Sequence, residues 1–292
     1  DTRQYIDSFQ GVKYFTGLKK FIYEVAEYQQ DMTAAPDLGL SGMDKLEKVT
    51  IYSESMHIGT INLQDCTNLQ QLALIPDSEH MIYVDGINLQ GCTNLDSFIC
   101  GGQTDQIDLS GLKKLEDVMF TGETETLNLD RCSKLKNIYI ISDTLKTLSL
   151  KGVRKLKGIT VKAPSLESLD LSKNKKLKNV NCHYTQITSL DLSGNKDLKY
   201  LHCQNNRKLT SLDVTGCTSL RYLRCHNTAL TKINVKTNKK LEILGCKNTK
   251  ITSLKLKKNR KLRFLNCMGT KVQKLDLSKT CIRGEGRLRC EK

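Results

Sequence analysis

The sequence predicts a solenoid of short parallel β-strands with little helix, and three observations lead to this prediction. From Leu169 onward the pattern Leu-Asp-Leu-Ser-x-Asn-x-x-Leu-x-x-Leu-x-Cys recurs every 21 or 22 residues. Each copy holds two short runs in which inward and outward residues alternate, which is typical of strands. The residues between the runs are turn formers, in stretches too short for an ordinary helix. Units of this length bury their apolar edges only against their neighbours, so the copies should stack with strands on two sides of each coil.

The repeat register extends into the less regular N-terminal half. Thirteen residues after each of the first eleven unit starts stands an apolar residue or a cysteine, from Ile51 to Cys267. We therefore predict a solenoid over residues 38–280, with eleven units and the beginning of a twelfth. The unit starts are Leu38, Ile61, Ile87, Ile107, Leu127, Leu148, Leu169, Leu190, Leu212, Ile233, Leu254 and Leu275.

The two ends of the chain do not follow the repeat. Residues 1–37 carry apolar side chains at every third position over part of their length, and we predict an irregular N-terminal segment that caps the stack. Within it, the helix-forming residues between Tyr23 and Gln30 predict two helical turns. Residues 281–292 are predicted to be a basic C-terminal tail. An uncapped apolar end beside this tail would favour a homodimer or a further domain.

The repeat resembles the leucine-rich repeats. Leu198 to Asn206 fits the segment Leu-x-x-Leu-x-Leu/Cys-x-x-Asn-x-Leu of that family, and Leu169 to Asn174 resembles its 21-residue, IRREKO-type subclass in gut bacteria. The resemblance covers about residues 38–280. It implies a bacterial protein that is secreted or held at the cell surface, and a strand-lined face that is the usual recognition surface.

Ten of the twelve cysteines occupy repeat positions, so we predict that they are buried free thiols acting as small apolar residues. Parallel side chains on neighbouring strands rarely reach the dihedral angle of a disulfide. Cys281 and Cys290 fall outside the repeat, where a disulfide and two free thiols both fit the sequence. Six cysteines take an inward strand position, namely Cys100, Cys182, Cys203, Cys225, Cys246 and Cys267, and four replace the repeat asparagine, namely Cys66, Cys92, Cys132 and Cys217.

No motif in the sequence indicates catalysis, a metal site or a cofactor, so we predict a non-enzymatic protein. Phosphate loops, metalloprotease helices and nucleophile elbows are absent, as are Cys-x-x-Cys pairs. No apolar run approaches the roughly 20 residues that cross a bilayer. An acidic residue recurs on the outward side of the first strand, where turn hydrogen bonds or salt pairs are favoured over a cation-binding ladder; its copies are Asp170, Asp191, Asp213 and Asp276.

Charge divides the chain into an acidic and a basic half. Residues 1–146 hold 12 Lys and Arg against 22 Asp and Glu, whereas residues 147–292 hold 34 against 9. Stacked turns in the basic half predict a ridge of basic side chains, which favours a solubilising surface. The alternative is a ridge that binds an anionic polymer such as teichoic acid or a sulfated glycan, whereas nucleic acid is disfavoured because no aromatic residues interleave the ridge. The ridge residues are Lys175, Lys176, Lys239, Lys240, Arg260 and Lys261.

Outward positions of the second strand predict a ligand-binding face. Tyrosine and arginine, which are enriched at interface hot spots, gather there. We expect a protein partner, although packing between neighbouring rings, carbohydrate stacking, the anionic-polymer ridge and a structural spacer for a further domain all stay open. The predicted face consists of Tyr200, His202, Tyr222, Arg224, His226, Ile243 and Phe264.

Overall fold

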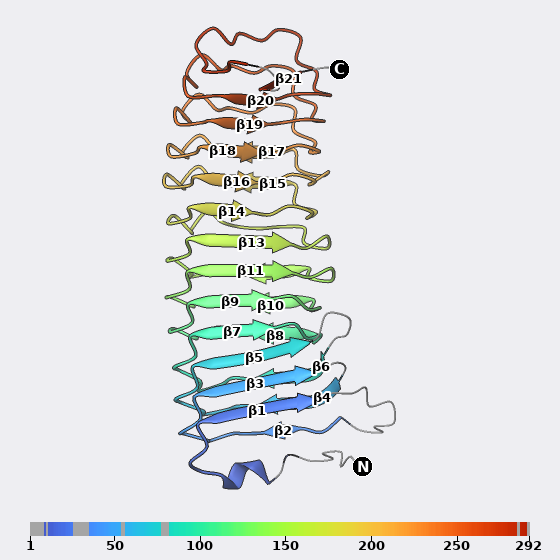
Figure 1. Cartoon of the computed structure of the whole chain (residues 1–292), viewed down its shortest axis with the longest axis vertical. Coiled ribbons are helices and arrows are strands. Elements are labelled where there is room, and N and C mark those ends of the chain that lie inside the picture. The colour runs from blue at the N-terminus through green and yellow to red at the C-terminus, as the bar shows by residue number, and fades with distance from the viewer. Residues whose placement is uncertain are drawn as a thin grey trace.

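The computed structural model describes residue 9 and residues 11–25, 35–53, 56–76, 82–284 and 287–290. These residues wind into an elongated solenoid whose coils stack along one axis (Figure 1). The strands are parallel, and within the described part of the chain the one helical element is the 3-10 turn η1 (Val12–Tyr14). The predicted solenoid of short parallel strands with little helix is confirmed.

A 13-stranded parallel sheet, here called the main sheet, forms one side of the stack. Each coil adds one strand in register, so that Tyr200, Leu201 and His202 pair with Tyr222, Leu223 and Arg224. In order the strands are β1 (Lys20–Val25), β3 (Lys48–Ser53), β5 (Gln71–Pro76), β7 (Ser97–Cys100), β9 (Asp117–Phe120), β11 (Asn137–Ile141), β13 (Gly158–Lys162), β14 (Asn179–Asn181), β16 (Tyr200–His202), β18 (Tyr222–Arg224), β19 (Ile243–Gly245), β20 (Phe264–Asn266) and β21 (Leu288–Arg289).

The opposite side of the coils carries shorter ladders. They comprise β2 (Leu38–Gly39), β4 (Met56–Asn62) and β6 (Ile82–Asn88), then β8 (Gln106–Asp108), β10 (Thr126–Asn128) and β12 (Thr147–Ser149), and finally β15 (Ser189–Asp191) with β17 (Ser211–Asp213). Beyond Asp213 this side has no assigned strand among the described residues, yet Val235, Leu254 and Leu256 stay buried. Side chains on this side therefore continue to alternate between buried and exposed positions beyond the last assigned strand.

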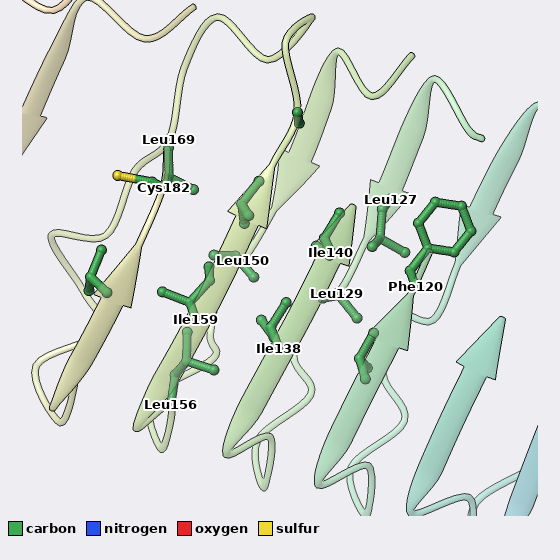
Figure 2. Close-up of a cluster of buried hydrophobic side chains, with 14 of the residues drawn as sticks. Phe120, Leu127, Leu129, Ile138, Ile140, Leu150, Leu156, Ile159, Leu169 and Cys182 are labelled. Carbon is green, nitrogen blue, oxygen red and sulfur yellow. The ribbon is translucent and has the colours of Figure 1, made fainter. Parts of the chain in front are cut away.

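Inward side chains of the two sides fill one continuous core. Figure 2 shows Phe120, Ile138 and Ile140 of the main sheet facing Leu127, Leu129 and Leu150 of the opposite side. All eleven residues predicted thirteen positions after the unit starts are buried, from Ile51 to Cys267. Burial of these apolar side chains, at about 1.5–3 kcal/mol each, is the main term that stabilises a stack of short units.

Buried donors at the repeat-asparagine position connect neighbouring coils. The Asn195 Nδ2 donates to the Asn174 carbonyl at 2.8 Å, and the Asn259 Nδ2 donates to the Asn238 carbonyl at 3.0 Å. Where cysteine replaces asparagine its thiol plays the same part, since the Cys217 Sγ lies 3.2 Å from the Leu192 carbonyl. An amide and a thiol both supply a donor, which explains why the two residues alternate at one position.

The ten repeat cysteines are buried and free, as predicted. Cys290, however, does not fall outside the repeat. Strand β21 pairs with β20, Leu288 opposite Leu265, and the Cys267 amide donates to the Arg289 carbonyl at 2.7 Å. Cys290 therefore occupies the next position in register after Cys267, at the end of the column of cysteines, where its thiol is exposed. Cys281 and Cys290 are both exposed free thiols.

The helix predicted from Tyr23 to Gln30 is wrong in its first turn, because Tyr23 to Val25 belong to β1. Phe21 and Tyr23 alternate along this strand and pack on the core, and the Tyr23 ring lies 5.0 Å from that of Phe9. Tertiary pairing with β3 thus overrides local helix propensity. Residues 26–30 lie outside the described residues, and the boundaries at residues 37 and 280 stay predictions.

Candidate ligand-binding face

The main sheet brings the sequence-predicted face together on its outer surface. Tyr200, Tyr222, Ile243 and Phe264 follow one another in register on β16, β18, β19 and β20, and we call them the aromatic row. His202 and Arg224 form a parallel row two residues further along the strands. His226 lies two residues after the end of β18 and is half-buried.

Two members of the aromatic row pack face to face. The rings of Tyr200 and Tyr222 have centroids 4.7 Å apart and planes 12° apart. Tyr200 is 39% exposed and the three other members are half-buried. At the far end the Arg289 guanidinium lies 5.9 Å from the centre of the Phe264 ring. Cross-strand packing and an accessible apolar surface therefore occur together in this row.

A chain of ion pairs beside the aromatic row fixes Tyr222. Glu242 accepts from the Arg221 Nε at 2.6 Å and from the Arg263 Nε at 3.3 Å. Burial alone would raise the pKa of Glu242, but the hydrogen bonds and charges of the two arginines outweigh it and lower that pKa below its ordinary value. The Nη2 of Arg263 then donates to the Tyr222 hydroxyl at 3.4 Å. This network was not predicted from the sequence, although all three charged residues stand nine residues after their unit starts.

The histidines of the face favour their neutral forms. Burial lowers the pKa of His202, and the positive charge of Arg224 lowers it further. Burial, followed by the charges of Arg224 and Lys247, has the same effect on the pKa of His226. Burial and the positive charge of Lys162 also lower the pKa of His183, which lies one coil before His202. Arg224 is exposed and supplies permanent positive charge beside these rings.

A shallow groove of about 560 Å³ lies on the same outer surface, over β7 to β16, and we call it the sheet groove. It exists because the row that continues the aromatic row toward the N-terminus holds only small side chains. Met119 and Tyr139 stand 44% and 39% exposed along it, and Tyr200 and His202 close its end. This groove was not predicted from the sequence, although the small residues that signal it stand ten residues after their unit starts, namely Ser97, Asp117, Asn137, Gly158 and Asn179.

The six residues of the predicted basic ridge are exposed. They follow buried Asn174, Asn238 and Asn259 in the turns. Of the two units between them, one places Lys196 and Asp197 at these positions and the next places the neutral pair Thr218 and Ser219 there. The ridge is therefore interrupted in its middle.

The recurring aspartates make turn hydrogen bonds, as favoured from the sequence. The Asp170 Oδ1 accepts from the Ser172 amide at 2.9 Å, and the Asp191 Oδ1 accepts from the Ser193 amide at the same distance. Across the described residues no three His, Cys, Asp or Glu side chains gather as metal ligands. None of the helices in that part of the chain is long and apolar enough to span a membrane.

Comparison with known proteins agrees with this geometry. A family model described as "Leucine Rich repeat" matches residues 205–222. The functional domain of InlJ from Listeria monocytogenes superposes with a TM-score of 0.55 at 20% identity over 92% of this chain and 66% of that one. The chain has the leucine-rich-repeat fold. The InlJ structure is described as including a cysteine ladder, and this leucine-rich-repeat solenoid carries its own column of inward thiols.

Two further solved structures are similar at lower scores. The TLR13-ssRNA13 complex aligns with a TM-score of 0.48 and 19% identity, over 80% of this chain and 40% of that one. The internalin inlF from Listeria monocytogenes aligns with a TM-score of 0.45 and 16% identity, over 74% of both chains. The leucine-rich-repeat chain described here spans less than two thirds of the InlJ and TLR13 chains. No curated protein matches its sequence.

Proposed function

We propose that this leucine-rich-repeat chain is a non-enzymatic recognition module that binds a protein partner on the outer surface of its main sheet. The observation that carries the proposal is the Tyr200–Tyr222 stack, with centroids 4.7 Å apart, on the outer surface of the main sheet. It supports a site centred on these rings and flanked by His202 and Arg224.

Energetics support this choice of site. Tyrosine and arginine are enriched at hot spots, because tyrosine offers a large contact area with few rotatable bonds and arginine offers several hydrogen-bond donors on a planar charged group. Tyr222 is held on both sides, by the ring of Tyr200 and by Arg263. A partner would therefore immobilise little at this point, and less of the binding free energy is spent on ordering side chains.

The sheet groove supports an extended footprint. It adjoins Tyr200 and His202 and runs across β14, β13, β11 and β9 to β7. A partner segment that enters the groove and rests on the aromatic row would extend over nine neighbouring strands, from β7 to β20, which is compatible with the roughly 800 Å² per side of a standard interface. We propose that the leucine-rich-repeat module acts at or outside a bacterial cell surface, in keeping with the family resemblance of its repeats.

Affinity capture tests the proposed site. The variant Tyr200→Ala/Tyr222→Ala/Phe264→Ala is compared with wild type and with Tyr184→Ala, a control tyrosine that is 50% exposed and precedes buried Thr185 in a turn. Proteins retained from host and bacterial surface extracts are quantified by mass spectrometry, and circular dichroism checks the fold. We expect proteins that wild type and control retain and the triple variant loses. Equal retention by all three folded proteins would contradict the proposal.

A further inference from the structure

Two neighbouring units depart from the repeat on the side opposite the main sheet. Most C-terminal units place aspartate and then serine or threonine at the second and fourth positions, as in Asp191 and Ser193. The unit that starts at Ile233 has Asn234 and Lys236 there, and the unit that starts at Leu254 has Lys255 and Lys257. Two adjacent units have thus exchanged acidic and hydroxyl side chains for neutral and basic ones.

The exchange does not serve the fold. In the regular units the aspartate accepts a hydrogen bond from the amide two residues on, at 2.9 Å for Asp191. Asn234 keeps this bond, since its Oδ1 accepts from the Lys236 amide at 3.2 Å. Lys255 has no acceptor in its side chain and gives the bond up. The exchange gains only an exposed ion pair, between Lys257 and Asp276 at 3.5 Å, which contributes little to stability. The lost turn hydrogen bond therefore points to a ligand.

These residues line a second groove of about 890 Å³, which we call the lysine groove. Half-buried Ile233 and Leu275 contribute aliphatic surface to it, together with buried Leu254. Asp276 is the one carboxylate among its lining residues, and it pairs with Lys257 at 3.5 Å. Six exposed lysines surround it, namely Lys232, Lys236, Lys255, Lys257, Lys258 and Lys274.

We infer that the lysine groove binds an acidic polysaccharide, a linear chain of sugar rings that carry sulfate or carboxylate groups. Equivalent residues of adjacent coils, such as Lys236 and Lys257, stand about 4.8 Å apart along the rod, so the positive charges recur along a line. Such a row selects an elongated polyanion over a small ion. Six lysines against one carboxylate give the electrostatic attraction.

The lining residues decide between classes of polyanion. No aromatic side chain is among them, so the groove offers no platform on which nucleic-acid bases stack. Its aliphatic floor of Ile233, Leu254 and Leu275 can contact the apolar C–H faces of sugar rings between the charged groups. Inorganic polyphosphate has no such apolar faces. The site is separate from the aromatic row and does not depend on the proposed protein-binding function.

Substitutions that restore the regular repeat test the inference. In Lys255→Asp/Lys257→Ser the chain carries the residues that neighbouring units have at the same positions, so the turn regains its hydrogen bond and the fold should be kept. The matched control is Lys175→Asp/Lys176→Ser, which changes the net charge equally on the basic ridge. Binding of a heparin-derived octasaccharide to the full chain is measured by isothermal titration calorimetry at fixed salt, with circular dichroism as the check of folding.

We expect the groove variant to bind the octasaccharide at least tenfold more weakly than wild type, and the control to bind within about threefold of it. Equal losses in both variants would show that net charge or the ridge is responsible, and no loss in the groove variant would show that the groove is not the site. Either result overturns the inference. Inorganic polyphosphate and single-stranded DNA serve as competitors, and displacement at equal or lower charge concentration by either one overturns the assignment to a polysaccharide.

Discussion

The phenol rings of Tyr200 and Tyr222 stack face to face across two neighbouring coils, with their planes 12° apart. They can do so because β16 and β18 pair in strict register and place equivalent side chains one above the other. The same register aligns His202 with Arg224 and places Ile243 beside Tyr222. A repeat sequence therefore converts single outward residues into continuous rows, and the content of each row decides what the surface can bind.

Thiol accessibility should divide the cysteines into two classes. Burial raises the pKa of Cys100 and of Cys182 to about 12, so these thiols are neither accessible nor ionised near neutral pH. With Ellman's reagent at pH 8 we expect two rapidly reacting thiols in the native protein, Cys281 and Cys290, and twelve in guanidinium chloride. Rapid reaction of three or more native thiols would show that the inward column is open.

Cysteine and asparagine should be exchangeable at the position that connects the coils. Cys217→Asn keeps a donor near the Leu192 carbonyl, whereas Cys217→Ala removes the thiol and leaves that buried carbonyl with the Asn195 amide as its donor. We expect the alanine variant to lose about 0.5–1.5 kcal/mol of unfolding free energy and the asparagine variant to lose less. Urea denaturation followed by circular dichroism measures both. An asparagine variant that is less stable than the alanine variant would contradict the exchange of one donor for another at this position.

Two glycines at the same repeat position should respond differently to alanine. A Cβ on Gly216 would overlap the Ser193 carbonyl, whereas a Cβ on Gly194 would lie 3.6 Å from the nearest atom, in the side chain of Lys175. Gly216→Ala should therefore force adjacent turns apart and lower the melting temperature, while Gly194→Ala should leave it within about 2 °C of wild type, since ordinary surface substitutions change stability by under about 0.5 kcal/mol. Equal melting temperatures would show that the close approach is absent.

Stability should fall as the outer face is acidified. The pKa values of His183, His202 and His226 are lowered in the folded state, so the unfolded chain takes up protons more readily. Their contribution to stability is present above the unfolded value of about 6.5 and is lost as the pH falls through the folded values. We expect a lower melting temperature at pH 5.5 than at pH 7.5, and a smaller difference in the His202→Gln variant. An equal difference in melting temperature in both proteins would show that His202 does not contribute to this pH dependence.

Repetition makes the inward side of this fold predictable. Cys182, Cys203 and Cys225 could be placed in the core from spacing alone, because a solenoid repeats the same environment in every coil. Spacing does not predict burial or register where the interval between repeats changes. Cys290 follows Cys267 by 23 residues and was missed, although β21 puts it in register. Tyr23 was assigned to a helix because local propensity carries no information about the strand that pairs with β1.

The sequence predicts which residues form rows on the outer surface, but it does not predict the shape of that surface. Tyr200, Tyr222 and Phe264 were identified because large side chains mark their positions, whereas the sheet groove arises from the small side chains of Asn137 and Gly158. Likewise, Glu242 could be placed on the surface but not in contact with both Arg221 and Arg263, because charged side chains of neighbouring coils have several partners within reach. Grooves and ion-pair networks depend on side-chain conformations that spacing does not specify.

Site-specific photo-crosslinking tests most directly whether the outer surface of the main sheet is the recognition surface. A benzoylphenylalanine at Asn181, which lines the sheet groove together with Tyr200, is compared with one at exposed Ser168, next to the unit start Leu169 on the opposite side. After irradiation with surface extracts, we predict a discrete protein adduct from position 181 that the Tyr200→Ala/Tyr222→Ala substitutions abolish, and none from position 168. Adducts of equal yield from both positions, or an adduct that persists without the tyrosines, would contradict the assignment of this surface.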